Sequence, residues 1–162
     1  MLQRVLSARV SVGDPTLNAF RGEEIVGAIG PGLLVYVGIA AGDGSTEVAW
    51  LARKIAELRL FPVDAAEGGA TEGARSMERS LADTGGAALL VSQFTLLADT
   101  RRGRRPAFTG AAAPDVAAPL IDAIADALHA RGIEVARGRF GAHMRVQSEN
   151  DGPVTILLDS RD

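Results

Sequence analysis

The strongest predicted strand of the chain is Ala87-Ala88-Leu89-Leu90-Val91-Ser92-Gln93-Phe94-Thr95-Leu96-Leu97-Ala98, and the prediction of the fold depends on it. Side chains alternate between the two faces of a strand, so Gln93 and Thr95 are expected to share one face. Ser92 and Phe94 are expected on the other face. The polar residues need partners, which are either neighbouring backbone groups or a ligand in a pocket. In the second case Gln93 offers an amide and Thr95 a hydroxyl.

Apolar patterning on both sides of this stretch predicts further strands and two helices. Period-two alternation is typical of a half-buried strand, a continuous apolar run of a strand covered on both faces, and helical spacing of an amphipathic helix. Many strands with two helices favour an α+β arrangement, with the helices packed on a sheet or a flattened barrel. The strands are expected at 6–12, 24–29, 33–40, 60–63, 133–137, 144–148 and 154–158, and the helices from the N-cap Ser45 to about residue 58 and over 115–131.

Length and composition limit the classes of protein. The 162 residues are 47% hydrophobic, which is enough for one domain, 1–162, with a substantial core. The absence of cysteine excludes disulfides and thiol chemistry, and no apolar run is long enough to cross a membrane, so a cytoplasmic protein is expected. Two histidines without cysteines provide no metal-ligand set, and no glycine-rich phosphate loop precedes a helix, so no metal or cofactor is predicted. Segments 14–22 and 64–86 are expected to be loops.

Arginines are concentrated in one short segment. Although the net charge is −3, Arg101, Arg102, Arg104 and Arg105 all lie within Thr100–Pro106. A charge run of this kind is either a solvated face or a surface for phosphate groups. Only the second alternative predicts salt-dependent binding of nucleic acid.

A second segment with functional character lies near the end of the sequence, Asn150-Asp151-Gly152-Pro153-Val154-Thr155. Asp-Gly between two apolar runs indicates a tight turn, and Pro153 has no N–H to donate to a strand ladder. A cis bond between Gly152 and Pro153 would form a rigid corner able to hold a small ligand, whereas a trans bond would form an ordinary turn.

Four blocks stand in a fixed order along the chain: Ser92-Gln93-Phe94-Thr95-Leu96, Ala98-Asp99-Thr100-Arg101-Arg102-Gly103-Arg104-Arg105-Pro106, Phe140-Gly141-Ala142-His143-Met144 and Asn150-Asp151-Gly152-Pro153-Val154-Thr155. Together with Gln3-Arg4-Val5 and Gly30-Pro31-Gly32-Leu33-Leu34-Val35, they resemble the D-aminoacyl-tRNA deacylase (D-tyrosyl-tRNA(Tyr) deacylase) family over nearly the whole chain. The resemblance implies an α+β fold in α/β/β layers, with mostly antiparallel sheets forming a flattened barrel with two packed helices.

The resemblance also implies an activity, hydrolysis of the ester that joins a D-amino acid to the 3′ end of tRNA, without a cofactor. It implies a homodimer in which the Gly-cisPro pair of one subunit enters the active site of the other and rejects L-amino acids, while glycine passes. Neither a membrane nor DNA is expected as a partner. The residues so assigned are Gln93 and Thr95 for catalysis, Ser92, Phe94, Met144, Gly152 and Pro153 for substrate binding, and Arg101, Arg102, Arg104 and Arg105 for tRNA binding.

Two mechanisms remain open at this point. Thr95 is a nucleophile in the first, although no base is evident beside it. In the second, which we favour, backbone donors near Gln93 and Phe94 stabilise the oxyanion, Gln93 orients the terminal adenosine, and the 2′-hydroxyl of the substrate activates water. His129 and His143 are predicted to be ordinary surface residues. Two other functions also remain open, a non-catalytic nucleic-acid-binding module and a hydrolase of small D-amino acid esters.

Overall fold

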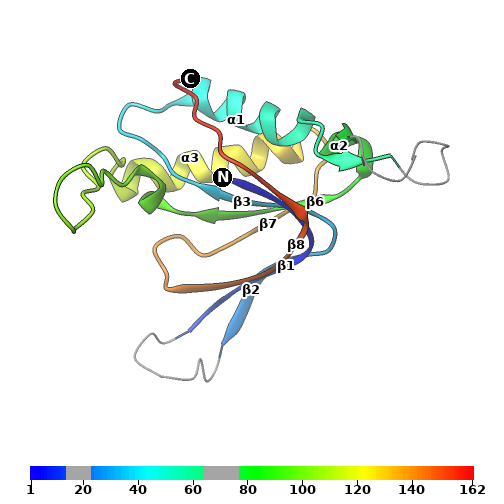
Figure 1. The fold of residues 1–162 in the computed structure, drawn as a ribbon, viewed down its shortest axis with the longest axis horizontal. Helices are drawn as coiled ribbons and strands as arrows, with labels where there is room; N and C mark the ends of the chain where they lie inside the picture. The colour runs from blue at the N-terminus through cyan, green and yellow to red at the C-terminus, as the bar shows by residue number, and fades with distance from the viewer. Residues whose placement is uncertain (14–22, 64–76) are drawn as a thin grey trace.

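The computed structural model describes residues 1–13, 23–63 and 77–162. It has a mixed α+β architecture with a barrel-like sheet, which confirms the predicted fold class (Figure 1). Within these ranges the elements are β1 (Leu2–Val12), β2 (Glu24–Ile29), β3 (Gly32–Val37), α1 (Ser45–Glu57), β4 (Phe61–Pro62), β5 (Met77–Arg79), α2 (Leu81–Thr84), β6 (Ala87–Ser92), the 3-10 helix η2 (Phe94–Leu97), α3 (Pro114–His129), β7 (Val135–Arg137) and β8 (Met144–Ile156).

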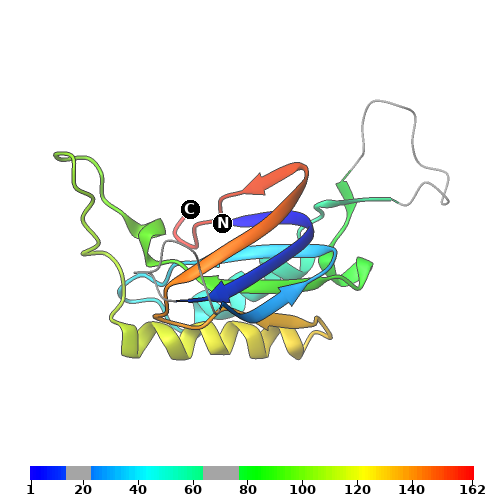
Figure 2. The same ribbon diagram turned by 90° about the horizontal axis from the view of Figure 1, so that it is seen from below.

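The bend in β1 divides the sheet into two layers. On one edge, β1 pairs antiparallel with β2 through Ala8 and Ile29 and with β3 through Val5 and Gly32, so the register continues across the break at Gly30-Pro31. On its other edge β1 pairs antiparallel with β8 along most of its length. Figure 2 shows β1 and β8 folding back together, so that each contributes to both layers.

β3 and β6, which pair in parallel, form the middle of the molecule. Leu33 of β3 and Leu90 of β6 face one hydrophobic cluster, which includes Ile124 of α3. The alternate residues Leu34 and Leu89 belong to a second cluster, which includes Ala8 and Val10 of β1. Helices α1 and α3 cover one face (Figure 1), and the other layer of strands covers the opposite face. The continuous apolar run at 33–40 therefore reflects burial on both faces, and the layers follow the order α/β/β.

The two layers approach each other again where β2 meets β7. A Cβ atom on Gly27 of β2 would lie 2.6 Å from the carbonyl oxygen of Arg137 in β7. Because real Cβ atoms do not come so close to a backbone oxygen, only glycine allows the strands to close at this point. This contact nearly completes the barrel.

The two long helices differ slightly from their predicted ends. Gly44, not Ser45, is the N-cap of α1, and the carboxylate of Glu47 accepts its backbone N–H at 2.8 Å. α3 begins at Pro114, one residue earlier than predicted, and Pro119 lies in its second turn. Gly132, with a φ of +78°, follows the end of the helix. Neither helix, nor any other within the described ranges, is long and apolar enough to span a membrane.

Several predicted bounds were wrong: β1 begins at Leu2 rather than at residue 6, and β3 ends at Val37 rather than at residue 40. The strand expected at 87–98 stops at Ser92, and a 3-10 helix follows. The strands expected at 144–148 and 154–158 are one strand, β8, with a bulge in place of a hairpin turn. The expected loop at 64–86 contains β5 and α2 after residue 76, whereas 64–76 and the predicted loop at 14–22 lie outside the described residues.

Candidate functional site

A cavity of 570 Å³ opens where β6 ends. Its walls come from the end of β6 and the start of η2, the segment leading into α3 and the first turns of that helix, and the segment leading into β8. The lining residues are Val37, Ile39, Val91, Ser92, Gln93, Phe94, Phe108, Ala111, Ala112, Pro114, Ala117, Ile121, Phe140, Gly141, Ala142, His143, Met144 and Val146. The cavity thus joins two of the four sequence blocks, which are about fifty residues apart in the chain.

The change from strand to 3-10 helix shapes the wall beside Gln93. Its backbone N–H still donates to the carbonyl of Val37 at 2.8 Å, as in a strand, and the chain then turns into η2. Gln93 N–H is therefore occupied and unavailable for an oxyanion, contrary to part of our expectation. Among the described residues no acceptor takes the N–H of Phe94, which begins a 3-10 helix where backbone donors lack intrahelical partners.

Gln93 and Thr95 are brought together, but not by strand alternation. The Gln93 side-chain amide donates a hydrogen bond to the Thr95 hydroxyl. Gln93 lines the cavity, as do Ser92, Phe94 and Met144, whereas Thr95 is not among the lining residues. Thr95 is therefore placed to hold the Gln93 amide rather than to meet a substrate in the cavity.

Aromatic side chains form part of the cavity rim. Phe94 is 58% exposed and meets Phe108 edge-to-face, with ring centroids 5.0 Å apart. Phe140, which is 40% exposed, also lines the cavity. Exposed aromatic rings beside a cavity are suited to packing on a flat apolar group such as a nucleobase.

The cavity lining has no acidic or strongly basic side chain. Of the described residues that line it, only His143 has a titratable side chain, and it is exposed. His143 is therefore a surface residue, as predicted, but one that borders the site. Across the described ranges no group of three or more His, Cys, Asp or Glu residues is arranged to hold a metal ion. The described lining thus offers no carboxylate as a general base, and the His143 imidazole is the one side chain in it of a type that serves as one.

Gly152 and Pro153 lie far from this cavity within the same chain. Both are exposed, the peptide bond between them is cis, and neither lines the cavity. They follow Met144 along β8 by eight and nine residues, or about 26–30 Å of strand length at 3.3 Å per residue. Figure 2 shows β8 running from one end of the sheet to the other before it turns back. The two segments expected to share a site therefore do not meet within one chain.

A buried arginine and an amide hold the corner that contains these residues. The Arg4 guanidinium is 5% exposed, donates to the Leu60 carbonyl at 2.7 Å and forms an ion pair with the Asp151 carboxylate at 3.0 Å. The Asn150 side chain spans the bulge, accepting from Val154 N–H at 3.1 Å. Gly152 has a φ of +115°, and a Cβ there would lie 2.7 Å from Arg4 Nη2. Sequence reasoning missed Arg4, although an arginine in an apolar strand was a usable signal.

The arginine segment is an exposed loop. Arg101, Arg102, Arg104 and Arg105 are all exposed, and the segment connects η2 to Phe108. None of the four lines the cavity, but Phe94 before the segment and Phe108 after it do.

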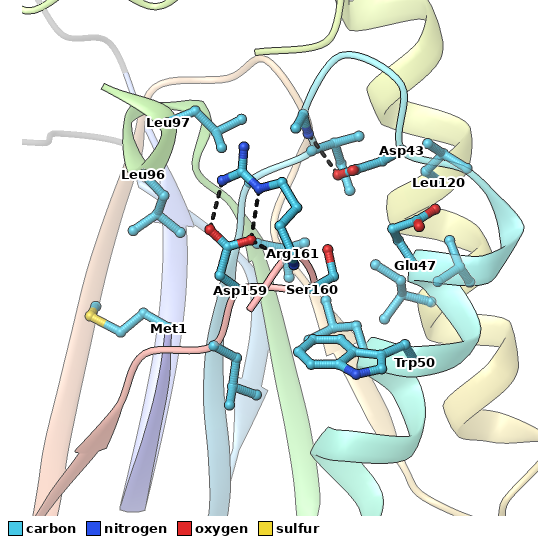
Figure 3. Close-up of a pocket in the computed structure, with 18 of the residues that line it drawn as sticks. Met1, Asp43, Glu47, Trp50, Leu96, Leu97, Leu120, Asp159, Ser160 and Arg161 are labelled. Atoms are coloured by element: carbon cyan, nitrogen blue, oxygen red, sulfur yellow. Dashed lines mark hydrogen bonds and ion pairs between the residues drawn. The ribbon is translucent and has the colours of Figure 1, made fainter. Parts of the chain in front are cut away.

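A second cavity of 150 Å³ lies between α1, the end of β3 and the C-terminal residues (Figure 3). Asp159 and Arg161 form an ion pair at 2.6 Å beside it, and Trp50 of α1 lines it. The ion pair lowers the pKa of Asp159 to about 2 and raises that of Arg161. Because this cavity contains neither Gln93 nor Phe94, it is separate from the candidate site.

Comparisons with known proteins agree on one family. The model of the family described as D-Tyr-tRNA(Tyr) deacylase matches residues 1–159. The D-aminoacyl-tRNA deacylase of Roseiflexus sp. (strain RS-1) is 54% identical over 99% of this chain and 92% of its own. That of Kineococcus radiotolerans is 49% identical over 99% and 98%.

Solved structures give the same fold. The structure named c-Myc DNA Unwinding Element Binding Protein has a TM-score of 0.81 and 33% identity, covering 98% of this chain and 96% of that one. A structure described as a probable eukaryotic D-amino acid tRNA deacylase has a TM-score of 0.71 and 19% identity, covering 94% and 93%. On the family match and the identity to these relatives, the chain belongs to the D-aminoacyl-tRNA deacylases, which are carboxylic ester hydrolases.

Proposed function

We propose that this chain acts as a homodimer in which the cavity of one subunit and the Gly152–Pro153 corner of the other form one site. The 3′-terminal adenosine and the ester enter the cavity, and the carbonyl groups of Gly152 and Pro153 of the partner subunit hold the α-amino group of the amino acid. An L side chain then collides with this corner, while a D side chain points away from it. Selectivity arises from exclusion of the wrong enantiomer.

The observation that carries this proposal is the separation of the two segments. The corner is exposed, does not line the cavity, and lies about 26–30 Å along β8 from the start of the strand, where Met144 lines the cavity. A closed two-fold dimer presents the same surfaces of both subunits to each other, so a corner can serve the neighbouring cavity without moving.

The reaction is hydrolysis of an ester. Water attacks the ester carbonyl, the bond from the carbonyl carbon to the ribose oxygen breaks, and the products are a free D-amino acid and tRNA with its terminal hydroxyl. The N–H of Phe94 stabilises the oxyanion, and Gln93, fixed by Thr95, orients the adenosine. No carboxylate is among the described lining residues and His143 lies exposed at the border of the cavity, so we assign activation of the water to the 2′-hydroxyl of the substrate.

The same exclusion mechanism predicts a second substrate. Glycine has no side chain to collide with the corner, so glycyl-tRNA passes the filter that rejects L-amino acids. We therefore propose that mischarged glycyl-tRNA is also hydrolysed, and that the enzyme protects translation from both kinds of ester.

Matched D- and L-tyrosyl-tRNA test the proposed function. The purified protein should release tyrosine from the D-ester and leave the L-ester intact, while glycyl-tRNA should be cleaved. Equal cleavage of the D- and L-esters would contradict the exclusion mechanism. Cleavage of neither ester would favour the alternative of a non-catalytic nucleic-acid-binding module.

The alternative module is supported by one comparison. The 33%-identical solved structure is named for binding to a DNA element. Binding of a DNA duplex with the same affinity as aminoacyl-tRNA, without ester cleavage, would support it. A hydrolase of small D-amino acid esters, the remaining alternative, would be insensitive to salt because it needs no phosphate contacts.

A further inference from the structure

The loop over residues 100–106 is fixed beside the cavity at both ends. At its base Asp99 N–H donates to the Ala107 carbonyl at 2.7 Å, and Ala107 N–H returns a bond to Asp99 at 2.9 Å. Immediately outside this pair, Phe108 contacts Phe94 on the cavity rim. Figures 1 and 2 show the loop, in yellow-green, projecting from the end of the molecule where β8 begins. Its arginines are therefore presented next to the entrance of the cavity.

The four arginines of the loop are not equivalent. Arg101 is engaged by Asp99 through two parallel contacts, Nε to Oδ1 at 2.9 Å and Nη2 to Oδ2 at 2.7 Å. Its backbone N–H also donates to the Asp99 carboxylate, and the side-chain hydrogen bonds lower the pKa of Asp99 and raise that of Arg101. A bidentate pair uses the same donors that would otherwise hold a phosphate.

Arg102, Arg104 and Arg105 are exposed and have no carboxylate partner within the part of the chain that the structure describes. This differs from several arginines elsewhere on the surface, where a carboxylate neutralises the charge. Examples are Arg131 with Glu57, Arg137 with Asp122 and Arg139 with Glu24. Uncompensated positive charge is therefore concentrated in a loop beside a cavity whose described lining has no carboxylate, lysine or arginine.

We infer that Arg102, Arg104 and Arg105 bind backbone phosphates of the single-stranded 3′ end of tRNA, whereas Arg101, held by Asp99, is a positioning residue. The inference deepens the proposed function and rests on it. If the terminal adenosine occupies the cavity, the preceding nucleotides must leave through its entrance and pass the loop. Arg102, Arg104 and Arg105 lie within four consecutive residues, so each can meet a different phosphate of one strand.

Phosphate contacts explain how one site can serve many tRNAs. They fix the position of a strand but carry no sequence information. Arginine is suited to this role because its planar fork matches a phosphate group and remains charged at any physiological pH. The loop thus supplies affinity and placement, and the cavity and corner supply selectivity for the amino acid.

The test is the salt dependence of kcat/KM on D-tyrosyl-tRNA. Each phosphate contact on a single strand contributes about −0.7 to the slope of log(kcat/KM) against log salt concentration, so three contacts predict about −2. Arg102→Gln, Arg104→Gln and Arg105→Gln should each reduce the slope by about 0.7. Arg131→Gln is the matched control, since it removes the same charge from the end of α3. Unchanged slopes in the three loop variants would overturn the inference.

A double variant tests the separate role of Arg101. Asp99→Asn with Arg101→Gln deletes the ion pair without changing the net charge. The expected result is the wild-type slope with a raised KM and an unchanged kcat, because the loop is less well placed but loses no phosphate contact. A slope reduced by about 0.7 would show that Arg101 itself binds a phosphate, and would overturn the assigned division.

A minimal substrate separates this inference from the proposed function. D-tyrosyl-adenosine carries the ester and the terminal nucleoside but no phosphate. Wild-type protein should cleave it with a slope near zero. Cleavage of neither the adenosine ester nor the tRNA ester would refute the proposed function, whereas cleavage of both with the same slope would refute only the phosphate-binding loop.

Discussion

The cavity and the Gly152–Pro153 corner differ in the kind of side chain that forms them. The described lining of the cavity is mostly apolar, and its polar side chains are the Ser92 hydroxyl, the Gln93 amide and the His143 imidazole. The corner is held by the ion pair of the buried Arg4 with Asp151, and by the side chain of Asn150. Charge thus holds a backbone shape at the corner, whereas the described lining of the cavity has no carboxylate, lysine or arginine. In the proposed function, the rigid corner provides selectivity and the substrate provides much of the chemistry.

Removal of the buried charge should give the largest effect. Arg4→Met leaves Asp151 without its partner and the Leu60 carbonyl without a donor. We expect a loss of about 2 kcal/mol of unfolding free energy, below the roughly 3–5 kcal/mol for a fully buried pair because Asp151 is partly exposed. Urea titration measures the loss, and discrimination between D- and L-tyrosyl-tRNA should fall with it.

Arg131→Met is the control for this prediction. Arg131 pairs with Glu57 at 3.1 Å on the surface, where an ion pair contributes about 0–1 kcal/mol. Equal losses in the two variants would mean that the corner does not depend on its buried charge. If a destabilised Arg4 variant still discriminated between D- and L-tyrosyl-tRNA as the wild type does, the corner would not be the source of selectivity.

Two alanine substitutions test the roles proposed for the side chains of Gln93 and Thr95. Gln93→Ala removes the lining amide that orients the adenosine, and we expect kcat/KM to fall about 10²-fold. Thr95→Ala removes only the hydroxyl that holds this amide, so its loss should be about tenfold or less. Single-turnover rates on D-tyrosyl-tRNA measure both. A loss of about 10⁴-fold in a folded Thr95→Ala protein would instead identify Thr95 as a nucleophile.

The sequence predicted these cavity residues for a reason that was only partly correct. Ser92, Gln93 and Phe94 do line a cavity, but strand alternation does not continue beyond Ser92. The segment from Phe94 to Leu97 is as apolar as a strand, and no glycine or proline marks the change to a 3-10 helix. The local sequence pattern therefore does not predict this change. In the structure, the change follows directly after the hydrogen bond from Gln93 N–H to the carbonyl of Val37 on β3.

The corner was harder to predict because its structure depends on distant partners. Asp-Gly indicated a hairpin, yet β8 continues through it because both of its halves pair with β1. The residue that holds it, Arg4, is about 150 positions away in the sequence. By contrast, the burial of 33–40 on both faces was predictable from its continuous apolar run. Apolar residues on both faces of a strand require a hydrophobic cluster on each side.

The smallest expected effect concerns the second cavity, which shares Val37 and Ile39 with the first but contains neither Gln93 nor Phe94. The pKa of Asp159 lies at about 2 in the folded protein, below its ordinary value of 3.8. A lowered folded-state pKa stabilises the folded protein above about pH 4, and this contribution is lost as the pH falls toward 2. Trp50, the only tryptophan of the chain, lines the cavity and reports the change.

We expect a shift in Trp50 emission between about pH 4 and pH 2, which Asp159→Asn should abolish. Deacylation at neutral pH should be the same in this variant, because Asp159 is outside the candidate site. A pH transition that persists in Asp159→Asn would assign it to another group.

Subunit complementation tests the central claim most directly. Gln93→Ala impairs the cavity, and Gly152→Ala impairs the corner, because a Cβ there would collide with Arg4. If the corner serves the neighbouring cavity, one of the two sites in a mixed dimer contains only intact parts. Co-expression of the two variants should therefore restore about a quarter of wild-type deacylation of D-tyrosyl-tRNA for random pairing. Activity no higher than the mean of the two separate variants would contradict the account.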